Sequence, residues 1–68
     1  MTALEEMGIV LRAVPGPRSA DHEIASWYEL KARLLEHLAD DAVGAEAARM
    51  RSQATAAHRH ATALLAST

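Results

Sequence analysis

The sequence has no cysteine and no phenylalanine, and its aromatic side chains are one tryptophan and one tyrosine. Without cysteine, the chain cannot form disulfide bridges, thiolate zinc sites or a cysteine nucleophile. Its longest run of large apolar residues is Ile9-Val10-Leu11, which is far too short to span a membrane. A secretory signal is also missing, because Glu5 and Glu6 stand where such a signal carries positive charge. These absences predict a cytoplasmic protein.

Catalytic signatures are equally scarce in this chain of 68 residues, which is long enough for one small domain. The sequence shows no Ser/His/Asp pattern, no paired carboxylates and no glycine-rich loop for a phosphate. Half of the residues are hydrophobic, but many of them are alanine, which buries little area. The net charge of -2 differs from the basic balance of most nucleic-acid-binding chains. The sequence therefore predicts a protein that is not an enzyme and that uses no cofactor.

Two amphipathic stretches predict an all-α fold, an antiparallel helical hairpin with helices at about 20–39 and 43–66. Pro15-Gly16-Pro17 breaks the chain before the first of them, since a proline pushes the preceding residue out of helical geometry. We therefore divide the chain into an N-terminal segment with its linker, 1–17, and the hairpin, 18–68.

The first predicted helix carries an apolar arc that covers about 160° of its circumference. Lys31 lies near the middle of this arc and interrupts it. We expect the aliphatic stem of Lys31 to lie along the apolar surface, with a role in setting the register of a dimer. Ser19 or Asp21 is expected to cap the helix at its start. The arc consists of Ile24, Trp27, Tyr28, Leu30, Leu34, Leu35 and Leu38.

The second predicted helix carries a heptad seam made mostly of alanine, a pattern typical of closely packed coiled coils. This seam is out of phase with the first arc by about half a step, so one straight helix would point the two in different directions. Asp40-Asp41, as a new N-cap, and Gly44, as a weak helix former, place a turn within about 39–44. The seam consists of Val43, Ala47, Met50, Ala54, Ala57, Ala61 and Leu64.

The distribution of charge also favours a hairpin. All nine acidic residues precede residue 47, and only basic charges follow it. Folding about residue 42 would bring Glu36 near Arg49, and Asp21 and Glu23 near Arg59. Exposed pairs of this kind contribute at most about 1 kcal/mol each, so they would guide the register of the two helices more than their stability.

Residues 1–14 allow two interpretations. Thr2 with Glu5 fits a capping box and predicts a short helix. Gly8 and the β-branched residues that follow it fit a short strand equally well. A lone strand would need a partner strand, which a second copy of the chain would supply.

The four histidines raise the question of a metal site. His58 and His60 lie about 160° apart around their helix and cannot bind one ion together. His22 would approach His60 across the hairpin, beside an acidic neighbour, and whether these two form a weak metal site stays open. A solvated polar cluster is the simpler expectation there. His37 is expected to interact with the two aspartates that follow it at the helix end.

One hairpin leaves much of the apolar arc uncovered, which predicts self-association. We expect a two-fold homodimer of hairpins, with residues 1–14 crossing to, or pairing with, the other copy. Trp27 is expected to be central to the buried surface. The predicted function is that of a small protein-interaction module, an adaptor, regulator or accessory subunit, with an unidentified protein partner and no membrane contact. The predicted interface consists of Ile24, Trp27, Leu30, Lys31, Leu34 and Leu38.

The alternative function is that of a small dimeric DNA-binding regulator. If residues 1–14 include a strand, the order strand, helix, helix resembles that of the ribbon-helix-helix repressors, in element order alone. That resemblance implies DNA binding by a dimer. The phosphate contacts would fall to the second predicted helix, which contains Arg49, Arg51 and Arg59.

Overall fold

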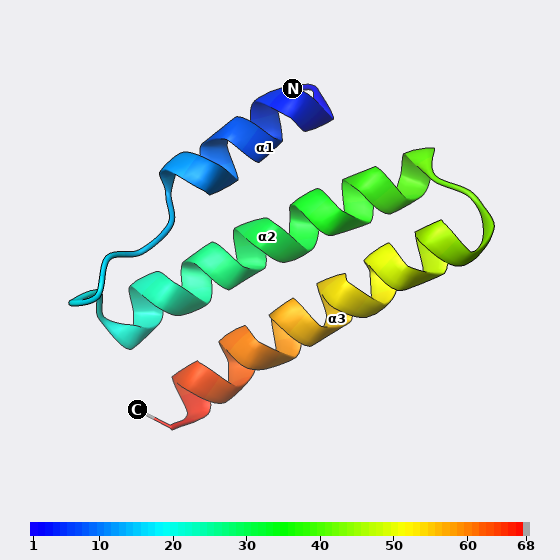
Figure 1. Cartoon of the computed structure of the whole chain (residues 1–68). Coiled ribbons are helices and arrows are strands. Elements are labelled where there is room, and N and C mark those ends of the chain that lie inside the picture. Colours follow the sequence, from blue (N-terminus) through cyan, green and yellow to red (C-terminus); the bar gives the residue numbers. More distant parts are fainter. Residues whose placement is uncertain (68) are drawn as a thin grey trace.

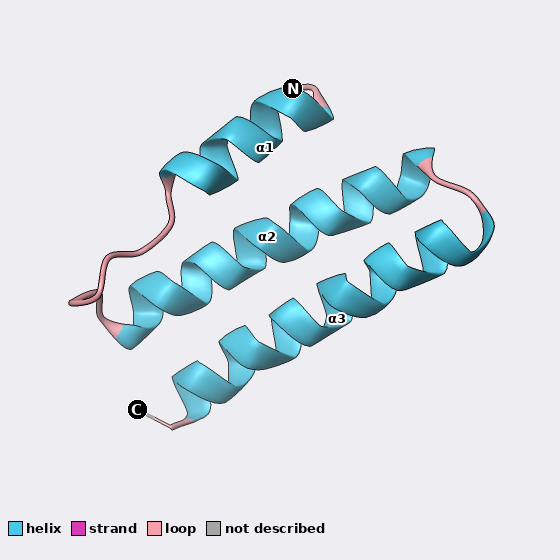
Figure 2. Cartoon of the chain, viewed as in Figure 1, coloured by secondary structure: helices cyan, strands magenta, loops and turns pink. Residues whose placement is uncertain are grey.

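The computed structural model describes residues 1–67 and contains three helices, α1 (Ala3–Arg12), α2 (Asp21–Asp41) and α3 (Gly44–Ala66). Figures 1 and 2 show α2 and α3 as an antiparallel pair, with α1 beside α2. The predicted all-α hairpin is thus confirmed. Within residues 1–67 no segment is a strand, so the strand interpretation of residues 1–14 is wrong. None of the described helices combines the length and apolar character that crossing a membrane requires.

The capping box at Thr2 decides the N-terminal segment in favour of a helix. The Thr2 hydroxyl accepts a hydrogen bond from the Glu5 backbone N–H at 3.2 Å, and the Glu5 carboxylate accepts one from the Thr2 N–H at 3.1 Å. Two backbone donors of the first turn are thereby satisfied. Val10 is buried against the rest of the chain, which offsets the weak helix propensity of Gly8 and its β-branched neighbours.

The start of α2 differs from the prediction. Ala20 occupies the N-cap position, so neither Ser19 nor Asp21 is the cap. Alanine offers no side-chain acceptor, and the carboxylate of Glu23 instead accepts a hydrogen bond from the Ala20 backbone N–H at 3.4 Å. The acidic side chains of this first turn also favour the positive end of the helix dipole.

The turn between α2 and α3 lies where the phase break predicts it, but its residues have other roles. Asp40 and Asp41 complete the last turn of α2, so the prediction that they cap α3 is wrong. Val43 is the N-cap residue and is 84% exposed, so it is not part of the alanine seam. Gly44 has a backbone φ of 60°, a left-handed conformation that costs other residues roughly 1–2 kcal/mol. This glycine allows the chain to reverse direction.

The alanine seam of α3 packs against α2. All the seam alanines of α3 are buried, and Ala32 of α2 forms a buried cluster with Ala54 and Ala57. Tyr28 and Leu35 of α2 pack around this cluster. Small residues on both sides let the helix axes approach closely, so contact along the length of the pair replaces the burial of a few large side chains. The buried seam positions are Ala47, Ala54, Ala57 and Ala61.

The register of the hairpin is displaced by about one helical turn from the predicted one. Tyr28 contacts His60 and Glu29 contacts His58, whereas folding about residue 42 would have placed residues near 56 opposite them. The predicted ion pairs Glu36–Arg49, Asp21–Arg59 and Glu23–Arg59 are therefore wrong, and α2 and α3 are joined by other charges. The turn consists of Ala42 and Val43, so it is shorter than the predicted one and does not by itself account for the displacement.

The three helices form a single layer. α2 contacts both neighbours, whereas α1 and α3 do not contact each other. Figure 1 shows α2 in the middle of this row. In residues 1–67 no large hydrophobic side chain is completely buried, and Val10 and Leu34 are the only buried residues larger than alanine. The core therefore consists of two seams, one on each side of α2, and a second layer is missing.

Candidate interaction face

The neighbours of α2 occupy opposite sides of its circumference. Trp27 and His37 reach α1, and Ala32 belongs to the cluster shared with α3. At about 100° per residue, the direction midway between Trp27 and His37 lies opposite to Ala32. The two remaining sides of α2 therefore face outward, one on each surface of the layer.

One of these surfaces is apolar along α2. Ile24, Lys31 and Leu38 recur every seven residues, about two turns apart, and so lie one above another. All three are partly exposed. We call this surface the open face; its α2 residues are Ile24, Trp27, Tyr28, Lys31, Leu35 and Leu38.

The opposite surface is charged. Ser26, Arg33 and Asp40 follow the same spacing on the other side of α2, and His22 precedes them by one turn; all four are exposed. Two ion pairs between α2 and α3 belong to this surface: Glu29–His58 at 2.7 Å and Asp40–Arg51 at 3.6 Å. We call it the charged face. Its polarity means that the open face alone offers an apolar surface for a further layer.

Two adjoining hollows lie on the open face. The first, of about 250 Å³, lies between the linker and the N-terminal half of α2. The second, of about 260 Å³, lies between α2 and α3. Tyr28 lines both, so the two hollows are neighbours. The first is lined by Val14, Pro15, Gly16, Ile24, Trp27 and Tyr28, and the second by Tyr28, Lys31, Gln53, Ala56, Ala57 and His60.

An aromatic cluster fixes the geometry at the centre of the open face. The Trp27 indole Nε1–H donates a hydrogen bond to the Val10 carbonyl oxygen at 2.8 Å, which ties α1 to α2. The Tyr28 ring meets the Trp27 ring edge-on at 5.1 Å between centroids and meets the His60 ring at 4.2 Å. The Lys31 Nζ lies 5.6 Å from the Trp27 centroid and 5.9 Å from the Tyr28 centroid. These rings stabilise the ammonium group in its apolar surroundings.

The structure divides the six predicted interface residues into two groups. Ile24, Trp27, Lys31 and Leu38 belong to the open face. Leu30 and Leu34 lie toward α1, and Leu34 is only 7% exposed. Helix α1 thus covers part of the arc from within the same chain.

Sequence reasoning missed Gln53 and His60, which α3 contributes to the open face. Both lie outside the heptad seam, and they reach Lys31 only in the observed register. Tyr28, in contrast, was identifiable from its place at the edge of the apolar arc. The observed register is therefore what adds polar groups to this surface.

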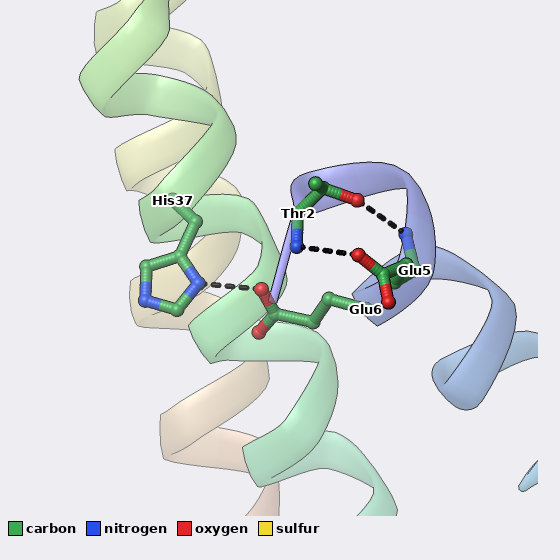
Figure 3. A network of polar contacts seen from close by, with 4 residues as sticks. All are labelled: Thr2, Glu5, Glu6 and His37. Atoms are coloured by element: carbon green, nitrogen blue, oxygen red, sulfur yellow. Dashed lines mark hydrogen bonds and ion pairs between the residues drawn. The ribbon is translucent and has the colours of Figure 1, made fainter.

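The structure shows no metal-binding arrangement of the histidines among the described residues. The His60 ring packs on Tyr28, and within residues 1–67 no three histidine, aspartate or glutamate side chains form a group able to hold a metal ion. The charge of Asp40 acts on His37 as expected, but the hydrogen-bond partner of His37 lies on another helix. The His37 Nδ1 lies 2.5 Å from a carboxylate oxygen of Glu6 in α1, as Figure 3 shows. The contact between residues 6 and 37 has no local sequence signal.

The Glu6–His37 contact makes the attachment of α1 sensitive to pH. The hydrogen bond to Glu6 and the charge of that carboxylate raise the pKa of His37 above its ordinary value of 6.5. Because the pKa of His37 is higher in the folded state, the contact stabilises the docking of α1 at pH values below the pKa of an unpaired histidine. This contribution is lost as the pH rises through the folded-state pKa of His37.

We therefore expect the melting temperature to fall between about pH 6 and pH 8, and the fall to be smaller in Glu6→Gln. Thermal melts followed by far-UV circular dichroism measure both profiles. The difference between the profiles isolates the pair, because the two proteins differ only at residue 6. Identical profiles for the two proteins would contradict the assignment.

No protein-family model, curated protein or solved structure matches the chain. The open face, with its hollows and its aromatic cluster, is therefore the basis for assigning a function.

Proposed function

We propose that this protein is a non-enzymatic protein-interaction module that self-associates as a homodimer through its open face. The observation that carries the proposal is the single layer: α1 and α3 lie on opposite sides of α2 without touching each other. Stable domains bury their apolar faces between at least two packed layers. A second copy, turned over by a two-fold axis, would supply the missing layer and would bury the same open face on both chains.

The surface of α1 supports an additional protein partner. Leu4 and Leu11 are seven residues apart on one side of α1, and they are 78% and 67% exposed. A helical partner with its own apolar stripe would fit such a surface. These two surfaces together suit an adaptor, a regulator or an accessory subunit.

The alternative, DNA binding, has less support. The strand on which the likeness to ribbon-helix-helix repressors depends is helix α1. Arg51 pairs with Asp40, and the remaining two arginines of α3 point away from the layer without aromatic neighbours between them. We therefore do not propose DNA binding.

Sedimentation equilibrium at micromolar concentration tests the homodimer. We expect the wild-type chain to sediment as a dimer, with a melting temperature that rises with protein concentration. Ile24→Lys, which places a charge on the open face, should shift the equilibrium to the monomer.

Ser26→Lys is the matched control, since it adds the same side chain one half-turn further along, on the charged face. The control should leave the dimer intact. A wild-type mass of 7.3 kDa, together with a melting temperature independent of concentration, would refute self-association.

A further inference from the structure

The hollow between α2 and α3 contains a cation that lacks a counter-ion. Lys31 lines this hollow, and none of the ion pairs within residues 1–67 involves it. His60 and Gln53 of α3 line the same hollow and can donate hydrogen bonds, as can the hydroxyl group of Tyr28 in α2. Two alanines, Ala56 and Ala57, line the rest. Such a set of donors around one ammonium group is suited to a single anionic group.

The adjoining hollow has the opposite character. Val14, Pro15 and Ile24 line it together with the Trp27 and Tyr28 rings, and none of these side chains carries a formal charge. The Trp27 N–H is already occupied, since it donates to the Val10 carbonyl oxygen. This hollow therefore offers contact area to an apolar group and little hydrogen bonding.

We propose that the two hollows form one groove that binds a monocarboxylate with an apolar tail. The carboxylate lies at Lys31 beside His60, and the tail extends past the Tyr28 ring toward Ile24. Together the hollows, of about 260 and 250 Å³, reach the size of ordinary small-molecule sites. One ammonium group matches one carboxylate better than it matches a doubly charged phosphate. All groove residues come from one chain, so this proposal goes beyond self-association, and in a dimer formed through the open face the groove would lie at the interface between the two copies.

Trp27 provides the measurement, because it is the only tryptophan of the chain and it lines the apolar hollow. Octanoate, 1-octanol and octylammonium serve as probes with the same tail and different head groups, each added below its aggregation concentration. We expect saturable changes in Trp27 fluorescence, with octanoate bound most tightly and octylammonium most weakly. Equal affinities for octanoate and octylammonium would overturn the proposal.

Two variants of Lys31 test the head-group site. Lys31→Met keeps most of the stem but removes the charge, and it should weaken octanoate binding by about tenfold or more. Its affinity for 1-octanol should not change, which also shows that the groove is intact in the variant. Lys31→Arg should retain most of the octanoate affinity.

Arg33→Met is the matched control, because it removes a positive charge from the opposite side of the same helix. It should bind octanoate like the wild type. If Lys31→Met and Arg33→Met bind octanoate equally well, the groove does not recognise the carboxylate and the proposal is wrong. Sedimentation of the same samples reports the state of association separately, so a monomeric protein that binds octanoate refutes the dimer alone.

Discussion

Leu34→Ala is expected to lower the free energy of unfolding by about 2–5 kcal/mol, the range found for leucine truncations in protein cores. Leu34 is the largest of the buried hydrophobic side chains and is 7% exposed. The other buried residues are Val10 and alanines, which are too small to fill the space that Leu34 would leave. A small domain has only about 5–15 kcal/mol of stability in total, so this single change should bring the chain close to unfolding.

Urea denaturation followed by circular dichroism measures the effect. Leu4→Ala is the matched control, because Leu4 is 78% exposed on α1. Alanine is also the better helix former, so the control should change stability by less than about 0.5 kcal/mol. A loss below about 1 kcal/mol for Leu34→Ala would mean that this side of α2 is exposed in solution and that α1 does not dock there.

The fold follows from patterns that lie within short stretches of the sequence. The arc of α2 and the alanine seam of α3 each predict a helix from spacing alone. The mismatch between their phases predicts the turn, and Gly44 supplies the backbone conformation that the turn needs. The spacing of Thr2 and Glu5 allows a capping box at the start of α1. Both capping hydrogen bonds form, which decides between the helix and the strand interpretations of this segment.

The register and the long-range contacts depend on packing that no local pattern encodes. A seam made mostly of alanine looks nearly the same after a shift of one helical turn, because most of its positions present the same small side chain. Weak exposed ion pairs could not resolve this ambiguity, and the predicted partner Arg59 takes no part in the ion pairs within residues 1–67. The observed register instead appears in specific contacts between the helices, where Tyr28 packs on His60 and Glu29 pairs with His58.

Part of the candidate site could be predicted, because several of its residues lie on one helix. The arc identifies Ile24, Trp27, Lys31 and Leu38 as one apolar surface with a lysine in it. It cannot show that α1 covers the Leu34 side of the arc, because that depends on where the linker directs α1. Nor can the sequence place His60 beside Tyr28, which requires the register. The sequence therefore identifies the open-face residues of α2 but not those that α3 contributes.

The alanine seam itself is expected to tolerate no larger side chain at its centre. Ala54 is 1% exposed and lies in the buried cluster with Ala32 and Ala57. Ala54→Leu would have to separate α2 from α3 or force side chains out of their preferred rotamers. We expect it to lower the free energy of unfolding by about 1–3 kcal/mol, although leucine is a good helix former and increases the apolar content.

Ala48→Leu tests whether this loss comes from close packing of the helices. Ala48 is exposed on α3, so the same substitution there changes helix propensity equally without meeting α2. Urea denaturation should place Ala48→Leu within about 0.5 kcal/mol of the wild type and Ala54→Leu well below both. If the two variants were equally stable, the helices would have room for a larger residue between them, and alanine would not be what sets their separation. A clear difference would instead show that the seam works through its small side chains, which bring the helices together and leave the large apolar residues of α2 for the open face.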